Sequence, residues 1–197
     1  MKQVLMSAIV LATVLTAKAQ VGSILVGGNI DLTTNKNKST DVKTTSFSFN
    51  PTVGYQFNNN WTAGLTAAIA SNKQEQGSPV TTYKNNSFAV GPFVRYARPI
   101  SNTFAVYGQL QSVIGSGKVK TLSGDVLTSS SKFSTVDIDL FPAVFINLKN
   151  SFGLNFNIGG LSYGSTKPKG ASSSNTFNFN FGKVLGIGIS KNFGGKK

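Results

Sequence analysis

The sequence predicts an all-β fold, an eight-stranded antiparallel up-and-down β-barrel. A hairpin unit with strict two-residue alternation and a Pro-x-Val near the centre of its first strand recurs at 47–55, 88–96 and 136–146, and a degenerate fourth copy follows. Gly, Ser, Thr, Asn and Phe are abundant, and no stretch after residue 20 carries a long helical period of apolar residues. Repeated alternating hairpins joined by turns are typical of closed barrels.

The first nineteen residues have the pattern of a secretory signal peptide. Lys2 supplies a positive charge, residues 4–16 form a short and mostly apolar stretch, and Ala17-Lys18-Ala19 is a small-x-small cleavage site. The apolar run is too short to span a bilayer as a helix. We expect cleavage between Ala19 and Gln20, which leaves a single barrel domain over 20–197.

Eight alternating segments follow the signal peptide. They cover 22–32, 44–57, 61–70, 87–96, 104–114, 133–148, 152–163 and 176–193. The connections alternate between short turns at 58–60, 98–103 and 149–151 and longer polar segments at 33–43, 71–86, 115–132 and 164–175. We expect the longer segments to be loops. Short turns on one side and long loops on the other, with an even number of strands, are features of outer-membrane barrels.

The two faces of these strands differ in a way that favours a membrane location. In 44–57 one face carries aromatic and β-branched residues, and the other carries Ser, Asn, Thr, Gly and Gln. Eight strands enclose a narrow interior, which cannot hold all the large apolar side chains of every strand. The apolar set therefore faces outward, toward lipid. Aromatic residues gather near the short turns, where a transmembrane barrel has an interfacial girdle: Tyr55, Phe57, Trp61, Tyr96, Phe104, Phe152 and Phe193.

Two features disturb the regular pattern. Pro51, Pro92 and Pro142 fall on the outward face, where each removes a backbone donor from the ladder, so we predict a bulge or local break at each. Lys183 also falls on the outward face. Either the phenylalanines before it rise beyond the membrane, or a slip near Gly182 changes the register of the last strand.

Composition excludes several kinds of chemistry. The chain has no cysteine and no histidine, so disulfides, Ser–His and Asp–His catalysis and Cys/His metal sites are impossible. The formal charge is +13, with lysines dispersed over the polar segments. An exported protein rarely meets nucleic acid, so we expect an anionic surface as partner and no nucleic acid. We expect no enzyme activity, catalytic residue, cofactor or bound metal.

A polar network inside the barrel is the main candidate site. Asp137 and Asp139 share the inward face, which leaves a carboxylate pair formally available for acid–base work or Ca²⁺. The favoured interpretation is a salt-bridge network with Arg95, since a buried charge needs a partner. We expect Gln109 and Gln111 to block the interior together with these three residues.

The chain resembles the small outer-membrane β-barrel proteins of Bacteroidetes, which are porin-like barrels of the OmpA/OmpX type. The residues that carry the resemblance lie at 26–31, 46–57, 87–96 and 152–163. It implies a barrel assembled by the outer-membrane assembly machinery. In that family the last strand usually ends near an aromatic residue that this machinery is thought to read. The matching residues here are Leu185, Ile187, Ile189 and Phe193.

These observations predict an integral outer-membrane protein of a Gram-negative bacterium with a structural, adhesive or envelope-integrity role. We expect a monomer with periplasmic termini and extracellular loops, in contact with outer-membrane lipid and lipopolysaccharide. Two alternatives remain at this stage. One is a narrow passive channel, and the other is a secreted soluble barrel that binds a small ligand.

Overall fold

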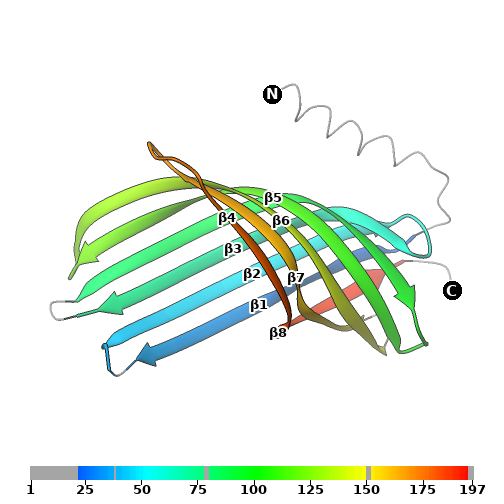
Figure 1. The fold of residues 1–197 in the computed structure, drawn as a ribbon. Helices are drawn as coiled ribbons and strands as arrows, with labels where there is room; N and C mark the ends of the chain where they lie inside the picture. Colours follow the sequence, from blue (N-terminus) through cyan, green and yellow to red (C-terminus); the bar gives the residue numbers. More distant parts are fainter. Residues whose placement is uncertain (1–21, 38, 78–79, 150–151, 195–197) are drawn as a thin grey trace.

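The computed structural model describes residues 22–37, 39–77, 80–149 and 152–194, with side chains for all of these except 149 and 183–185. The predicted signal peptide and its Ala19–Gln20 junction lie outside the described residues. Eight strands follow one another around a closed barrel (Figure 1). Each is antiparallel to the next, and β1 pairs with β8, which confirms the predicted up-and-down topology. Their bounds are β1 Ile24–Asn37, β2 Val42–Gln56, β3 Trp61–Gln76, β4 Thr81–Pro99, β5 Phe104–Ser123, β6 Val126–Lys149, β7 Phe152–Pro168 and β8 Ser174–Phe193.

Short turns close one end of the barrel, which we call the short-turn end. Before β3, the Asn58 Oδ1 accepts the backbone N–H groups of Asn60 and Trp61 at 2.9 and 2.8 Å. Before β5, the Ser101 Oγ accepts those of Thr103 and Phe104 at 3.2 and 3.0 Å. Short polar side chains that bond the backbone in this way are what turns of this length need. The predicted turns at 58–60 and 98–103 are confirmed, while the third, at 149–151, includes residues outside the described ones.

The opposite end, which we call the hairpin end, differs from the prediction. The four polar segments expected as long loops are mostly strand, so that expectation is wrong. Pairing between β5 and β6 continues to Ser123 opposite Val126, and only Gly124 and Asp125 form the turn. Serine, threonine and lysine side chains stay solvated on both faces of these hairpins. The apolar alternation that marks a strand therefore stops where the membrane-facing wall stops, while the backbone ladder continues.

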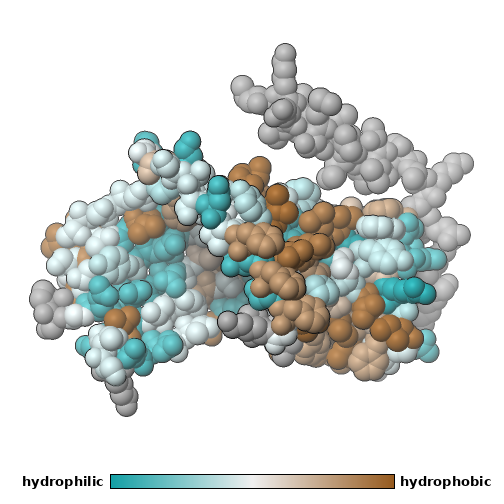
Figure 2. Space-filling view, viewed as in Figure 1, coloured by the Kyte–Doolittle hydropathy of each residue, from teal (hydrophilic) through white to brown (hydrophobic). Residues whose placement is uncertain are grey.

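The interior is small and mixed in character. The apolar residues with the least exposure, Leu25, Ala89, Phe93, Tyr107, Val113 and Ala143, point inward beside the buried polar residues Thr52, Thr62, Thr66, Gln109 and Ser190. On the outward face large apolar residues remain exposed, as Leu65 at 57% and Ile114 at 58% illustrate. Hydrophobic residues gather over the half of the molecule nearer the short-turn end, while the hairpin end is more hydrophilic (Figure 2). This distribution matches a lipid-facing wall with a narrow, filled lumen.

Each of the three prolines interrupts the ladder on one side only. Pro51 pairs with Gly28 of β1, but toward β3 the pairing skips from Phe49 to Thr52 with its register unchanged. Pro92 causes the same gap toward β5, between Val90 and Phe93. At Pro142 the gap toward β7 is accompanied by a register shift, which makes a true bulge. The predicted breaks are confirmed, and each lies on the side where the missing N–H would have donated.

The last strand contains the predicted slip near Gly182. Asn157 of β7 faces Gly186, but Gly159 faces Phe181, so four residues of β8 stand opposite one residue of β7. Gly182 and Gly159 have φ angles of 73° and 100°, a region that glycine occupies without strain. The slip resolves the difficulty posed by Lys183, because the outward series can restart in a new register beyond it.

The seam between β1 and β8 is closed only near the short-turn end. Pairing extends from Ile24, opposite Phe193, to Gly28, opposite Ile189. Beyond Gly28 the two strands diverge, and β7 and β8 curve away from the rest of the wall (Figure 1). In the described residues the outer edges of 29–37 and 174–188 therefore have no partner across the seam.

Close strand approach around Phe93 gives a test of this packing. A Cβ placed on Gly64 would meet the backbone of Val53 and Gly54, and would lie 2.8 Å from the Phe93 ring. We predict that Gly64→Ala lowers the free energy of unfolding by about 1–3 kcal/mol, because the filled interior cannot relax around it. Urea unfolding of the folded barrel in vesicles, followed by the fluorescence of Trp61, the single tryptophan, measures this change.

Gly108→Ala is the matched control, because a Cβ at Gly108 meets nothing within 4 Å. The control should unfold at the wild-type urea concentration. Equal unfolding midpoints for the two variants would contradict the packing described here.

Candidate functional site

A chain of hydrogen bonds joins four polar side chains inside the barrel. The Nε and Nη2 of Arg95 donate to the Gln109 Oε1 at 2.9 and 2.7 Å. The Gln109 Nε2 donates to the Gln111 Oε1 at 2.9 Å, and the Gln111 Nε2 donates to the Asp139 Oδ2 at 3.1 Å. The register explains the order, because Arg95 lies opposite Gln109 and Gln111 lies opposite Asp139. We call Arg95, Gln109, Gln111 and Asp139 the lumen chain.

Aromatic rings hold the guanidinium of Arg95 in place. Its Cζ lies 4.1 Å from the centroid of the Tyr107 ring and 5.8 Å from that of Phe93. A cation removed from water is stabilised by such ring faces, in addition to its hydrogen bonds. The Tyr107 hydroxyl donates in turn to the Asn155 Oδ1 at 3.1 Å, and the Asn155 Nδ2 donates to the Ser190 Oγ at 2.8 Å. Polar contacts thus cross the lumen from β4 to β8.

The structure corrects the expected salt bridge between Arg95 and the two aspartates. Among the described residues the ion pairs are Lys36–Asp41 and Lys73–Glu75, both at the hairpin end. Arg95 reaches Asp139 only through the two glutamines, because Gln109 occupies the position directly opposite it. Asp137 lines the same lumen cavity as the lumen chain but makes no hydrogen bond to it.

A cavity of about 610 Å³ lies beside the lumen chain. Its lining is rich in amides, hydroxyls and glycine, and includes Gly28 and Asn29 of β1 and Gly186 and Gly188 of β8. The cavity therefore reaches the point where the seam opens. Hydrogen bonding to water or another small polar molecule is the chemistry these groups can offer.

The described residues contain no group of three or more Asp, Glu, His or Cys side chains placed to hold a metal ion. Within the same part of the chain, no helix is long and apolar enough to cross a membrane.

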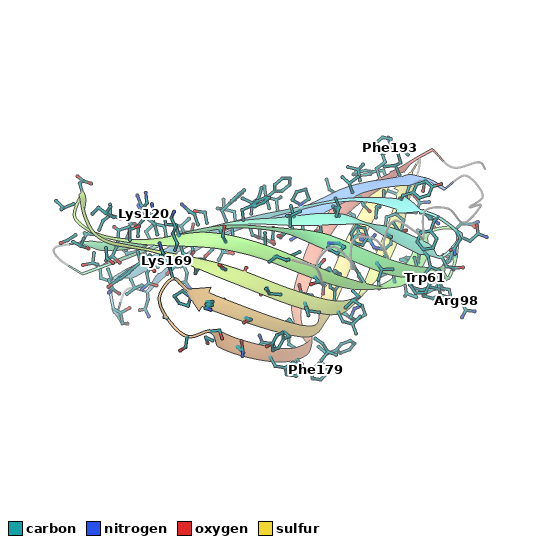
Figure 3. All side chains as sticks on the ribbon, turned by 90° about the horizontal axis from the view of Figure 1, so that it is seen from above. Trp61, Arg98, Lys120, Lys169, Phe179 and Phe193 are labelled. Atoms are coloured by element: carbon teal, nitrogen blue, oxygen red, sulfur yellow. The ribbon has the colours of Figure 1, made fainter. Side chains whose placement is uncertain are left out.

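Three of the four residues proposed as an assembly signal lie on the outward face of β8. Ile187, Ile189 and Phe193 are about half exposed, and the side chain of Leu185 lies outside the described residues. The Lys191 Nζ lies 5.0 Å from the centroid of the Phe193 ring, so its stem runs along the wall toward this terminal aromatic residue. Phe193 and Trp61 both lie toward the short-turn end (Figure 3). Trp61 packs edge-on against Tyr96, with ring centroids 4.9 Å apart.

Sequence reasoning missed the second half of the lumen contacts, formed by Tyr107, Asn155 and Ser190. All three have inward parity in alternating strands, which was the available signal. Their meeting across the lumen depends on the stagger of β5 against β7 and β8. Because β5 is not paired with β7 or β8, its stagger against them follows from the closed barrel and not from any one hairpin.

Comparison with known proteins gives similarities at two levels. The family described as "Outer membrane protein beta-barrel domain" matches residues 5–184. No curated protein sequence matches significantly. Among solved structures, the translocator domain of the autotransporter NalP from Neisseria meningitidis has 14% identity and a TM-score of 0.45, over 94% of this chain and 73% of that one.

Two smaller barrels are also similar. Neisserial surface protein A has 14% identity and a TM-score of 0.43, over 90% of this chain and 100% of that one. Ail of Yersinia pestis in a nanodisc has 19% identity and a TM-score of 0.38, over 88% of this chain and 100% of that one. Such distant likenesses carry no argument about function, whereas the family match spans nearly the whole chain. This chain belongs to the outer membrane protein beta-barrel domain family.

Proposed function

We propose that this protein is a plugged outer-membrane barrel with a structural, adhesive or envelope-integrity role. The lumen chain is the observation that carries the proposal. Gln109 is 3% exposed, and its amide is bonded on both sides, to Arg95 and to Gln111. A filled cross-section of this kind leaves no continuous path for solutes through a barrel of eight strands.

The proposal includes an orientation and a set of partners. The even number of strands brings the start of β1 and the end of β8 to the short-turn end, where Ile24 lies opposite Phe193. By analogy with bacterial outer-membrane barrels, that end is periplasmic and the hairpin end is extracellular. The proposed partners are outer-membrane lipid and lipopolysaccharide, and the barrel-assembly machinery during biogenesis. We further propose that the protein is a monomer, that it does not bind nucleic acid and that it comes from the Bacteroidetes branch of the family.

We also propose that the protein is not an enzyme. The sequence contains neither histidine nor cysteine, so the commonest general base and thiol nucleophile are unavailable. Asp139 accepts a hydrogen bond from Gln111, which gives this carboxylate a structural partner within the lumen. Asp137 and Asp139 are better explained as part of the polar filling of the barrel than as an acid–base pair.

A narrow passive channel is the second candidate function. The cavity of about 610 Å³ beside the lumen chain favours it, because this space already occupies part of the lumen. The earlier alternative of a secreted soluble barrel is set aside, because the family to which the chain belongs is one of outer-membrane proteins.

Recording from planar bilayers separates the plugged barrel from the channel. We predict that the purified wild-type protein gives no stable conductance steps, because the lumen chain and the Tyr107–Asn155–Ser190 contacts together cross the lumen from β4 to β8. Heat-modifiable mobility on gels identifies the folded barrel in the same preparation. Large, stable conductance from the folded barrel would overturn the plugged-barrel proposal and support the channel.

Removal of two members of the lumen chain should open the barrel. We predict that Arg95→Ala combined with Gln109→Ala produces conductance steps where the wild type has none. The loss of hydrogen bonds to a charged group should also lower stability, by about 1.5–3 kcal/mol per bond. Asn50→Ala is the control, since Asn50 lines the same cavity and belongs to no part of the lumen chain. A double variant that folds and stays electrically silent would show that other groups block the lumen.

A further inference from the structure

The outward face changes in the same order on seven of the eight strands as it approaches the hairpin end. An apolar residue is followed two positions further by a hydroxyl or amide residue, and two positions beyond that by lysine. All seven lysines are exposed. The series are Leu32–Thr34–Lys36, Phe47–Thr45–Lys43, Ile69–Ser71–Lys73, Phe88–Asn86–Lys84, Ile114–Ser116–Lys118, Val136–Ser134–Lys132 and Tyr163–Ser165–Lys167. We call these seven lysines the lysine belt.

The register brings members of the belt directly against one another. Lys73 lies opposite Lys84, and Lys118 lies opposite Lys132. Lys84 also lies opposite Lys120, which follows Lys118 on the same face. Like charges in directly opposed positions destabilise a sheet unless a counter-ion lies between them. Such an arrangement points to an anionic partner.

Carboxylates neutralise the positive charge of the lysine belt unevenly around the barrel. Lys36 lies 3.7 Å from Asp41, and Lys73 pairs with Glu75, whose pKa is lowered by the hydrogen bond from that lysine. These are the ion pairs among the described residues, so the belt lysines of β4 to β7, which are Lys84, Lys118, Lys132 and Lys167, have no carboxylate in contact. The uncompensated charge is therefore concentrated on one arc of the belt.

The height of the belt matches the polar boundary of a membrane. Ten residues separate Phe104, beside the short turn, from Ile114, where the apolar face of β5 ends. At a tilt near 45° this stretch climbs about 24 Å, which is close to the thickness of the apolar band of an outer-membrane barrel. Lys118 lies four residues further, at the depth of lipid headgroups.

A cleft of about 1000 Å³ lies on the uncompensated arc. Lys118, Lys132, Lys167 and Lys169 contribute to its lining. Lys120 and Lys169 are visible near the hairpin end, far from Trp61 (Figure 3). The cleft extends beyond this arc onto β2 and β3, and the outward-facing apolar residues Phe47, Ile69 and Phe88 also line it. The ammonium groups of this surface can bind an anionic group, and the neighbouring rings and alkyl side chains can contact a hydrocarbon chain.

We propose that this cleft binds a phosphorylated glycolipid of the surrounding leaflet. Its phosphate groups lie among Lys118, Lys132 and Lys167, and its acyl chains run down the wall past Phe88 and Ile69. The lipid supplies the counter-ions that the register of the lysines requires. This assignment rests on the proposed orientation, with the hairpin end at the cell surface, and does not depend on whether the lumen conducts.

Binding to a defined lipid tests the site. The full-length mature protein, folded in neutral detergent, is titrated with diphosphorylated lipid A, and bound lipid is counted by native mass spectrometry. Near a membrane surface each lysine contributes about 1 kcal/mol to binding an anionic lipid, so the triple variant Lys118→Gln, Lys132→Gln, Lys167→Gln should bind on the order of 100-fold more weakly. The triple arginine variant at the same positions keeps the charge and should retain binding.

The matched control removes the same number of charges from the compensated arc of the belt. Lys36→Gln, Lys43→Gln and Lys73→Gln together should weaken lipid binding by less than about threefold, because Asp41 and Glu75 already neutralise part of that arc. Heat-modifiable gel mobility selects the folded barrels of each variant. If the triple glutamine variant fails to fold, the single variants of Lys118 and Lys132 should each lose about fivefold to tenfold in affinity.

Three outcomes would overturn the proposal. Equal losses in the two triple variants would show a diffuse charge effect without a site. Undiminished binding of dephosphorylated lipid A would show that only the apolar wall is recognised. Competition by inorganic phosphate at the same concentration as the lipid would show an anion site that does not need the acyl chains. None of these results affects the bilayer recordings that test the plugged barrel.

Discussion

Backbone N–H and C=O groups within the hydrocarbon layer need partners from the protein, and the rest of this structure depends on that constraint, apart from the unpaired edges of β1 and β8 beyond Gly28. A single helix satisfies it alone, whereas strands satisfy it only by forming a closed ring. Seven of the eight pairings here join strands that are consecutive in sequence. Closure then fixes the parity of each strand, because alternate side chains must face lipid and lumen. The three prolines disturb this backbone pairing as little as possible, because each leaves one of its two neighbouring ladders in register and interrupts only the other.

Because the lumen is narrow, the size of each inward-facing side chain decides which neighbouring side chains can fit beside it. Phe93 is almost fully buried because Gly54 and Gly64 remove two side chains from the wall opposite its ring. The same shortage of space presses the guanidinium of Arg95 between aromatic rings and an amide. A buried cation normally requires a carboxylate, but here several weaker partners share that task.

Much of the fold could be predicted from parity and turn chemistry alone. Asn58 and Ser101 are residues typical of turns, and the two turns that contain them form as expected. The slip near Gly182 followed from the improbable place of Lys183 on a lipid-facing surface. The full length of the strands could not be predicted in the same way. Lys120 and Ser130 face each other in a ladder that keeps one register from Phe104 to Thr121, but neither side of the hairpin is buried.

The sequence could predict which polar residues face the lumen, but not which of them bond to one another. Inward parity placed Arg95, Gln109 and Asp139 on one surface, and it gave no information on stagger between strands. Stagger decides that Gln109, not an aspartate, stands opposite Arg95. The register of the lysine belt could not be predicted from the sequence for a related reason. Its members lie in segments whose polar composition predicted loops, so no register was assigned to them.

The partly closed seam has a consequence for how the chain folds. All pairings but one are made by hairpins, whose two strands are joined by a few residues and close quickly. The β1–β8 pairing alone joins residues that are far apart in the sequence, such as Gly28 and Ile189. Closing a loop of that length carries the largest conformational entropy cost in the fold, and only a short ladder repays it. Ring closure should therefore be the last and most easily reversed step, and β7 and β8 the first strands to separate from the wall when the protein unfolds.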